Sequence, residues 1–204
     1  ILDSLDLRIR ARPTTLRIDP DHQVLQRLDR EHLPPMLNLW ETDTSRTVIV
    51  PHAPTPAEEG SYASLMQRLQ HQPHITILST NNPDYSHPGS YLTVGSIARQ
   101  ILEDPLRNPC KDQVKVSSEG VTILNRHDES PDTAFLLSCS HPDYPEHIMT
   151  FFFGLSPEAM TPVSRLLFFY GWDSYLVYQQ GRVVARGLFD PVHSIQDVVL
   201  PSPS

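Results

Sequence analysis

The chain has 204 residues, 39% of them hydrophobic, with 20 prolines against 8 glycines and a formal net charge of −8. This length is enough for one generous domain, or for one domain and a fragment of another. No run of about 18 apolar residues occurs, which argues against a transmembrane segment. The scattered Lys and Arg residues argue against nucleic acid as a partner.

The first residues resemble neither a signal peptide nor a start of translation. The chain opens with Ile1 and has no charged segment followed by an apolar one, so we expect a processed protein or a fragment. Residues 1–18 alternate between apolar and polar side chains, as strands do. We interpret 1–18 as strands of an upstream β module, 19–198 as a single α/β domain and 199–204 as a frayed tail.

The first half of the domain alternates between strand and helix signals. A short helix capped by Asp19 or Asp21 is predicted to end at Pro34 and Pro35. The elements that follow are a strand at 46–51, a helix at 55–72, a strand at 74–80, a loop at 81–89, and a strand turning into a helix at 90–105. This order predicts an α/β layer with some parallel pairing, Rossmann-like or flavodoxin-like.

The second half is dominated by strands that follow one another directly. Its predicted elements are a hairpin turning at 118–120, strands at 133–140 and 147–154, a helix at 156–171, and a hairpin turning at 179–181. Together the two halves predict a three-layer α/β fold, with flanking helices and a mixed sheet of about six or seven strands.

Residues 139–147 concentrate potential metal ligands. They are Cys139, His141, Asp143, Glu146 and His147. Pro142 and Pro145 forbid the helical spacing on which a His-Glu-x-x-His zinc site depends. We therefore interpret 141–147 as a proline-restricted turn between two strands, and keep as the alternative a metal or haem site built on His141 and His147.

Ser156 lies between a predicted strand and a predicted helix, where serine hydrolases place their nucleophile. That motif needs a glycine two residues after the serine, and Glu158 stands there instead. A helix N-cap followed by Pro157 explains this serine fully. A hydrolase that pairs Ser156 with a histidine such as His141 remains as an alternative.

Gly95 stands at a strand-to-helix junction, and a helix N-terminus can bind an anion such as phosphate. One glycine forms neither of the glycine-rich nucleotide motifs, so a tight turn is the preferred interpretation.

Aromatic residues gather at 166–178. Tyr170, Trp172, Tyr175 and Tyr178 are suited either to a sugar or peptide groove or to a core edge with an interdomain surface. We favour the second interpretation and predict an interaction surface at Tyr170, Trp172, Asp173 and Tyr175. Asp173 lacks an acidic partner nearby in the sequence for glycosidase chemistry.

The two cysteines, Cys110 and Cys139, are compatible with a disulfide in an oxidising compartment or with two buried thiols. The sequence does not decide between them, and we favour reduced thiols.

Three segments are similar to one known protein family. Residues 16–38 resemble a segment that follows the catalytic region in some bacterial M1-type (gluzincin) aminopeptidases and in related ChaN-like lipoproteins. The similar positions are Asp19, Pro20, Asp21, Arg27, Leu28, Glu31, Pro34 and Pro35, while Gln26 departs from the pattern. Residues 140–154 and 166–187 resemble later elements of the same modules.

This resemblance implies a non-catalytic accessory module, because the His-Glu-x-x-His motif of the catalytic domain is absent from these residues. We expect the module to pack on a metallopeptidase domain, or to position substrate for it, without a cofactor of its own. The partner that the resemblance implies is the catalytic domain of the same parent chain, a zinc aminopeptidase, or a separate peptidase. The lipoprotein analogy implies a periplasmic or membrane-associated location, with a cytoplasmic location as the alternative.

Overall fold

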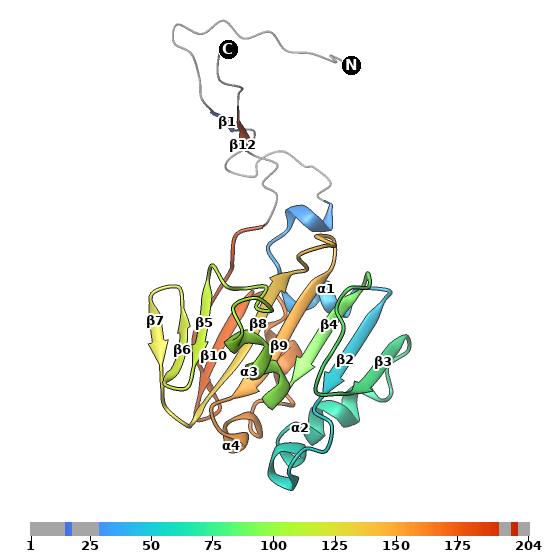
Figure 1. Cartoon of the computed structure of the whole chain (residues 1–204), viewed down its shortest axis with the longest axis vertical. Helices are drawn as coiled ribbons and strands as arrows, with labels where there is room; N and C mark the ends of the chain where they lie inside the picture. Colours follow the sequence, from blue (N-terminus) through green and yellow to red (C-terminus); the bar gives the residue numbers. More distant parts are fainter. Residues whose placement is uncertain (1–14, 18–28, 192–196, 200–204) are drawn as a thin grey trace, which may run out of the picture.

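The structure is a computed structural model that describes residues 15–17, 29–191 and 197–199. Its main element is a seven-stranded sheet (Figure 1). The strands are β2 (Arg46–Val50), β3 (Ile75–Ser79), β4 (Ser90–Val94), β8 (Thr133–Ser140), β9 (Ile148–Gly154), β10 (Tyr175–Gln179) and β11 (Arg182–Gly187). Their order across the sheet is β11-β10-β8-β9-β4-β2-β3. The predicted α/β fold with a mixed sheet is confirmed.

One half of the sheet is parallel and arises from the alternation of strands and helices in the sequence. β3, β2, β4 and β9 all run in the same direction. Helix α2 (Pro56–Leu69) connects β2 to β3, and helix α3 (Ser96–Glu103) follows β4. Thr55 caps α2 by accepting a hydrogen bond from the amide of Glu58, and Pro56 occupies the first helical position.

The other half is antiparallel, as expected for strands joined by short turns. β8 pairs with β9 and with β10, and β10 pairs with β11. The second hairpin turns at Gln180 and Gly181, which both have positive φ angles, of 50° and 77°. Positive φ at both central residues is the geometry that suits a two-residue hairpin between twisted strands.

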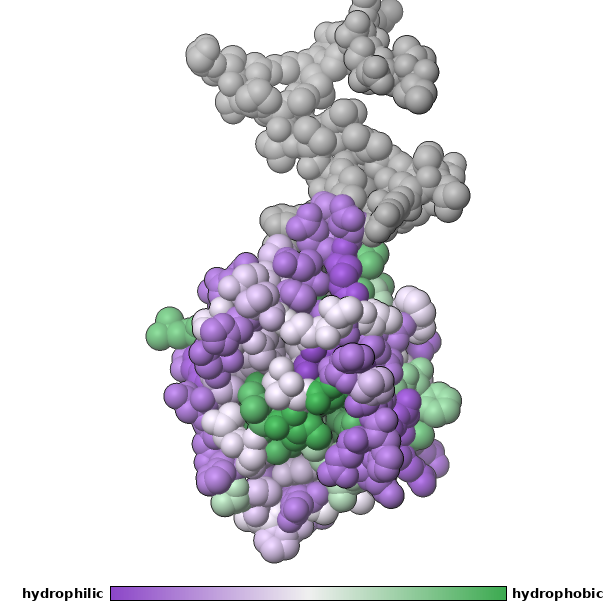
Figure 2. Space-filling model, turned by 90° about the vertical axis from the view of Figure 1, so that its right-hand side faces the viewer, coloured by the Kyte–Doolittle hydropathy of each residue, from purple (hydrophilic) through white to green (hydrophobic). Residues whose placement is uncertain are grey.

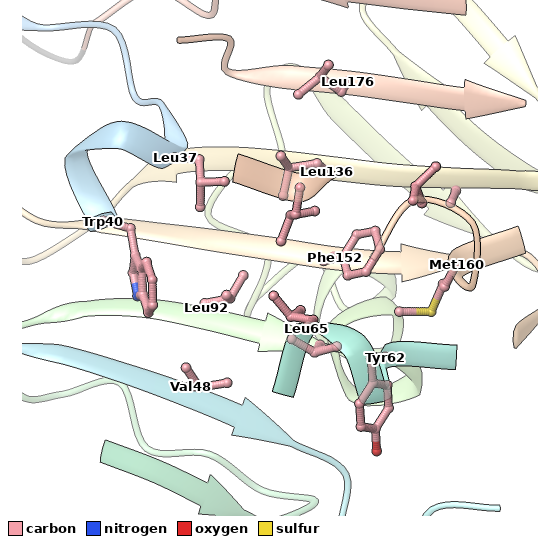
Figure 3. Close-up of a cluster of buried hydrophobic side chains, with 14 of the residues drawn as sticks. Leu37, Trp40, Val48, Tyr62, Leu65, Leu92, Leu136, Phe152, Met160 and Leu176 are labelled. Atoms are coloured by element: carbon pink, nitrogen blue, oxygen red, sulfur yellow. The ribbon is translucent and has the colours of Figure 1, made fainter. Parts of the chain in front are cut away.

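The first face of the sheet is covered by α2 and by three short elements: α1 (Leu37–Glu41), α4 (Pro157–Met160) and the 3-10 helix η2 (Leu167–Tyr170). Figure 3 shows the apolar side chains that these elements and the sheet bring together. Trp40, Leu65, Leu92 and Phe152 are completely buried in this cluster. We call this side the α2 face.

The second face carries α3 and a small antiparallel sheet of β5 (Val114–Ser117), β6 (Gly120–Ile123) and β7 (Arg126–Asp128). The predicted hairpin is β5–β6, and β7 extends it. On this side, the α3 face, Cys110 forms a disulfide with Cys139 of β8, with 5.6 Å between the Cα atoms. Our preference for reduced thiols is therefore corrected, because folding brings both buried side chains to the same point beneath the small sheet.

Two local predictions were also wrong. The helix predicted for 156–171 is interrupted after α4, because Pro162 lacks the N–H that would continue the helical ladder, and the chain becomes helical again only in η2. Helix α1 was not predicted, since its five residues are too few to show a helical period.

The predicted helix after Asp19 falls mostly on 18–28, outside the described residues, and the described part ends in a 3-10 turn, η1 (Arg30–His32). Of the proposed upstream module the structure describes β1 (Thr15–Arg17), which pairs with β12 (Asp197–Val199). Residues 1–14 and the tail at 200–204 lie outside the described part. None of the described helices is long and apolar enough to cross a membrane.

Candidate functional site

The turn at 141–147 joins β8 to β9, as predicted, and His141 organises it. The imidazole is 1% exposed. Its Nδ1 accepts hydrogen bonds from the amides of Asp143 (3.2 Å) and Tyr144 (3.3 Å), and its Nε2 donates to the carbonyl of Tyr85 at 2.8 Å. Both ring nitrogens are therefore engaged by the backbone, which suits a structural role in the turn.

This arrangement favours the neutral ring. Burial lowers the pKa of His141 below its usual value of 6.5, against the opposing effects of the Tyr85 carbonyl and the nearby carboxylates. A second proton would have to bind at Nδ1, which already accepts two amide hydrogens. We conclude that His141 stays uncharged at neutral pH.

His147, at the other end of the turn, contacts a buried carboxylate. Its Nδ1 lies 2.7 Å from Oδ2 of Asp43, and Ser90 donates its hydroxyl to the same oxygen at 2.5 Å. The guanidinium of Arg30 lies 3.7 Å away and also bonds the carbonyl of Glu146. Burial opposes the charge on Asp43, but the hydrogen bonds from Ser90, the Ser45 amide and His147 outweigh it, so the pKa of Asp43 is lowered.

The Asp43 cluster has the residue types of a catalytic triad but not its connections. In a triad the histidine lies between the serine and the carboxylate. Here the carboxylate lies between them, and the Ser90 hydroxyl accepts from the amide of Ile148 while donating to Asp43. The cluster ties the start of β4 to the start of β9, which is a structural role.

The candidate metal ligands, kept above as the alternative to a turn, do not converge. Cys139 is bonded to Cys110, and the two histidines are engaged as described above. Asp143 is exposed, and Glu146 lies 3.9 Å from Nε2 of His147. Across residues 15–17, 29–191 and 197–199, no group of three or more His, Cys, Asp or Glu side chains is arranged to hold a metal ion.

Ser156 is an N-cap, as predicted: its Oγ accepts a hydrogen bond from the amide of Ala159 at 3.3 Å. In the β8–β9 register Ala134 faces Gly154 and Ser140 faces Ile148. Ser156 and His141 therefore lie at opposite ends of β9, roughly 20 Å apart at the usual rise of a strand. No histidine is among the described residues that line the small hollow around Ser156.

That hollow lies where open α/β sheets bind ligands, at the carboxyl ends of the strands beside the point where the winding reverses. β2 continues into α2 on one face, and β4 continues through Gly95 into α3 on the other. A carboxylate oxygen of Glu58 accepts a hydrogen bond from the Ser96 amide at 2.6 Å. The same oxygen would lie only 2.7 Å from a Cβ at position 95, so the glycine there leaves room for the carboxylate. The chain's own carboxylate thus takes the position of a bound phosphate.

The predicted interaction surface has three half-buried members and one exposed member. Tyr170 packs edge-on against the buried Tyr178, and Tyr175 stacks on Phe189. Asp173 lies 3.9 Å from Arg186. Of these four residues, Trp172 is the one that is largely exposed, at 73%, and the other three are half-buried.

Sequence reasoning missed Phe169, which is 77% exposed and lies three residues before Trp172 in the chain. We define these two side chains as the aromatic surface. Nothing in the sequence distinguishes Phe169 from its neighbour Phe168, which packs between Trp40 and the guanidinium of Arg68.

Comparisons with known proteins identify no relative: the chain matches no protein-family model and no curated protein sequence.

Proposed function

We propose that this chain is a non-catalytic accessory module that docks, through the aromatic surface of Phe169 and Trp172, on the catalytic domain of a bacterial M1-type metallopeptidase. The observation that carries docking is the exposure of two large aromatic side chains in one short segment, 77% for Phe169 and 73% for Trp172. The kind of partner comes from the resemblance of residues 16–38, 140–154 and 166–187 to segments of such enzymes.

The segment that presents these side chains is firmly anchored. Leu167 is completely buried, and Phe168 stacks on Trp40 with 6.1 Å between the ring centroids. The carbonyl of Gly171 accepts the amide of Asn38 at 2.8 Å, and a Cβ at position 171 would collide with the Asn38 side chain. Anchors on both sides of Phe169 hold it in place before a partner arrives, which reduces the entropy lost on binding.

The energy available from this surface is appropriate for a docking contact. Full burial of one large apolar side chain contributes about 2–3 kcal/mol. Interface hot spots are enriched in tryptophan and typically contribute 2 kcal/mol or more. Two such side chains are therefore enough to hold domains that are already joined by one polypeptide, where the effective concentration is high.

The test uses the natural polypeptide that contains this sequence. An antibody against the domain, followed by intact mass measurement, should detect a species several times larger than 23.1 kDa, or a peptidase that co-purifies. Hydrogen exchange should then show protection of 167–172 relative to the isolated chain. Trp172→Ala should remove this protection and weaken docking about 30-fold, the equivalent of about 2 kcal/mol.

Leu106→Ser provides the matched control, because Leu106 is 97% exposed and follows α3 on the opposite face of the sheet. It should leave exchange at 167–172 unchanged. A native species near 23 kDa without an associated peptidase would contradict the proposal. So would equal exchange at 167–172 in the natural polypeptide and in the isolated chain.

A further inference from the structure

The β3 strand leaves one edge of the main sheet open. Among the described strands its only neighbour is β2, so its outer side carries unpaired backbone N–H and C=O groups. Natural proteins usually protect such edges with charged residues, proline or a covering element. The sequence of β3, ITILS, has neither charge nor proline. The opposite edge, β11, carries Arg182 and Arg186.

Each face of β3 exposes one large apolar side chain, next to the exposed polar side chains of Thr76 and Ser79. Ile77 is 38% exposed and Leu78 is 46% exposed. In the parallel register Ile77 lies beside Val48 of the α2-face core, and Leu78 lies beside Ile49 of the α3-face core. The two side chains therefore extend both buried layers to the edge of the sheet, and a further strand would continue both.

A groove adjoins this edge on the α2 face. Its volume is about 400 Å³, and it opens between the carboxyl ends of β2 and β3 and helix α2. Its walls include Val50, Pro54, Tyr62, Ala63, Met66 and Ser79. Figure 2, which views the side that carries β3, shows apolar residues gathered near the middle of this face within a hydrophilic surround.

The charge at the groove favours a basic occupant. Glu59 lines the groove, is exposed, and has no ion-pair partner among the described residues. A second copy of this chain would bring another net charge of −8 to the same edge, and like charge opposes association. A foreign segment with a Lys or Arg beside its apolar residues avoids this repulsion and pairs with Glu59.

We propose that the β3 edge and this groove form a peptide-binding site. An extended segment adds to the sheet as a strand next to β3, places one apolar side chain in the groove, and brings a Lys or Arg to Glu59. Strand addition of this kind takes affinity from main-chain hydrogen bonds and specificity from pockets for alternate side chains. The site is separate from the aromatic surface, because neither Phe169 nor Trp172 belongs to β3 or lines the groove.

The test uses this chain alone and a synthetic probe, the acetylated, amidated and fluorescein-labelled peptide Lys-Thr-Val-Thr-Val-Thr-Lys. Fluorescence anisotropy should show saturable binding. In an added strand, the N–H groups of alternate peptide residues point toward β3. N-methylation of these residues should weaken binding at least tenfold, whereas N-methylation of the residues between them should not. A peptide with Glu at both ends should bind at least threefold more weakly, and Glu59→Gln should remove that difference.

The matched variants place one lysine on each edge of the sheet. Ile77→Lys on β3 should weaken binding at least tenfold, while Val184→Lys on β11, where Val184 is 42% exposed, should leave it unchanged. Trp172→Ala should also have no effect, which separates this site from the docking surface proposed above. Circular dichroism checks that each variant is folded, and the methylated peptides test the site without any variant.

Three outcomes would overturn the inference. They are no binding at millimolar peptide, equal binding of the two methylated registers, and equal loss with lysine at positions 77 and 184. A concentration-dependent dimer in sedimentation that Ile77→Lys abolishes would assign the edge to a second copy instead. Docking through Phe169 and Trp172 could still hold in each of these cases.

Discussion

A carboxylate oxygen of Glu58 accepts a hydrogen bond from the backbone amide of Ser96 at 2.6 Å, although the two residues belong to helices on opposite faces of the sheet. The contact supplies an internal anion to the N-terminus of α3, where the unpaired amides and the helix dipole favour negative charge. Glu58 also lines the crevice at the reversal of the winding, where its carboxylate lies at the helix N-terminus that an anionic ligand uses in this architecture.

Removal of this carboxylate should destabilise the protein. We expect Glu58→Ala to lower the free energy of unfolding by about 1–2 kcal/mol, because the Ser96 amide loses a charged acceptor. Glu58→Gln should cost less, since it keeps an oxygen without the charge. Urea unfolding measures both. The control is Glu59→Ala, at an exposed neighbouring position of α2.

The same variant also tests whether Glu58 takes the position of an anion. With the α3 N-terminus unoccupied, inorganic phosphate should raise the melting temperature of Glu58→Ala more than that of the wild type. Equal free energies of unfolding for Glu58→Ala and Glu59→Ala would show that the Glu58 contact contributes nothing to stability. Equal phosphate effects on Glu58→Ala and the wild type would show that no anion binds in place of the carboxylate.

The disulfide should make a large contribution to stability. Cys110 and Cys139 are separated by 29 residues, and closing a loop of that length stabilises the folded state by about 3–4 kcal/mol in the chain-entropy account. We expect the double variant Cys110→Ala, Cys139→Ala to unfold at a correspondingly lower urea concentration. Reductant should destabilise the wild type and leave the variant unchanged. Two free thiols in the native protein, detected by alkylation and mass spectrometry, would contradict the pairing.

Local signals in the sequence were sufficient for most elements of the fold. The β-branched run at 46–50 and the cap at Thr55 predicted β2 and α2, since their determinants lie within a few residues. The order of strands was not predictable, because the pairing of β9 with β4 joins segments that are distant in sequence. The break near Pro162 has a local cause, the missing backbone N–H of proline, which outweighs the helical pattern around it.

The polar clusters could not be predicted at all from local patterns. His147 and Asp43 are 104 residues apart and Glu58 and Ser96 are 38 apart, so only the folded sheet brings each pair together. The exposure of Phe169 is likewise a consequence of tertiary packing, because Phe168 takes the position against Trp40. Only the proline-restricted turn at 141–147 and the N-cap at Ser156 could be inferred, since their geometry is local.

His141 should make stability depend on pH below neutrality. Its folded pKa lies below 6.5 because of burial, so the unfolded chain binds a proton more readily than the folded one. The contribution of His141 is complete above about pH 6.5 and is lost as the pH falls from there towards the lower folded pKa. The pKa of Asp43 is also lowered, so its contribution to stability is lost at a lower pH, as the pH falls below the usual carboxyl value of 3.8.

Urea unfolding at pH 5 and pH 7.5 measures this effect. The wild type should be less stable at pH 5, and His141→Asn should reduce the difference while lowering stability at pH 7.5. The control is His52→Gln, at an exposed position of the loop after β2. An NMR titration that placed the pKa of His141 at or above 6.5 would refute the argument directly.

Substitution and chemical labelling of Ser156 distinguish a helix N-cap from a catalytic nucleophile. If Ser156 is an N-cap, Ser156→Ala should lower the free energy of unfolding by about 0.5–1 kcal/mol. Ser156→Asp should leave it unchanged, because aspartate is an equally good cap at a helix N-terminus. A fluorophosphonate should not label the wild type, since the His141 that would activate the hydroxyl lies at the other end of β9. Stoichiometric labelling that disappears in Ser156→Ala would instead require a base from elsewhere and would make this chain a hydrolase.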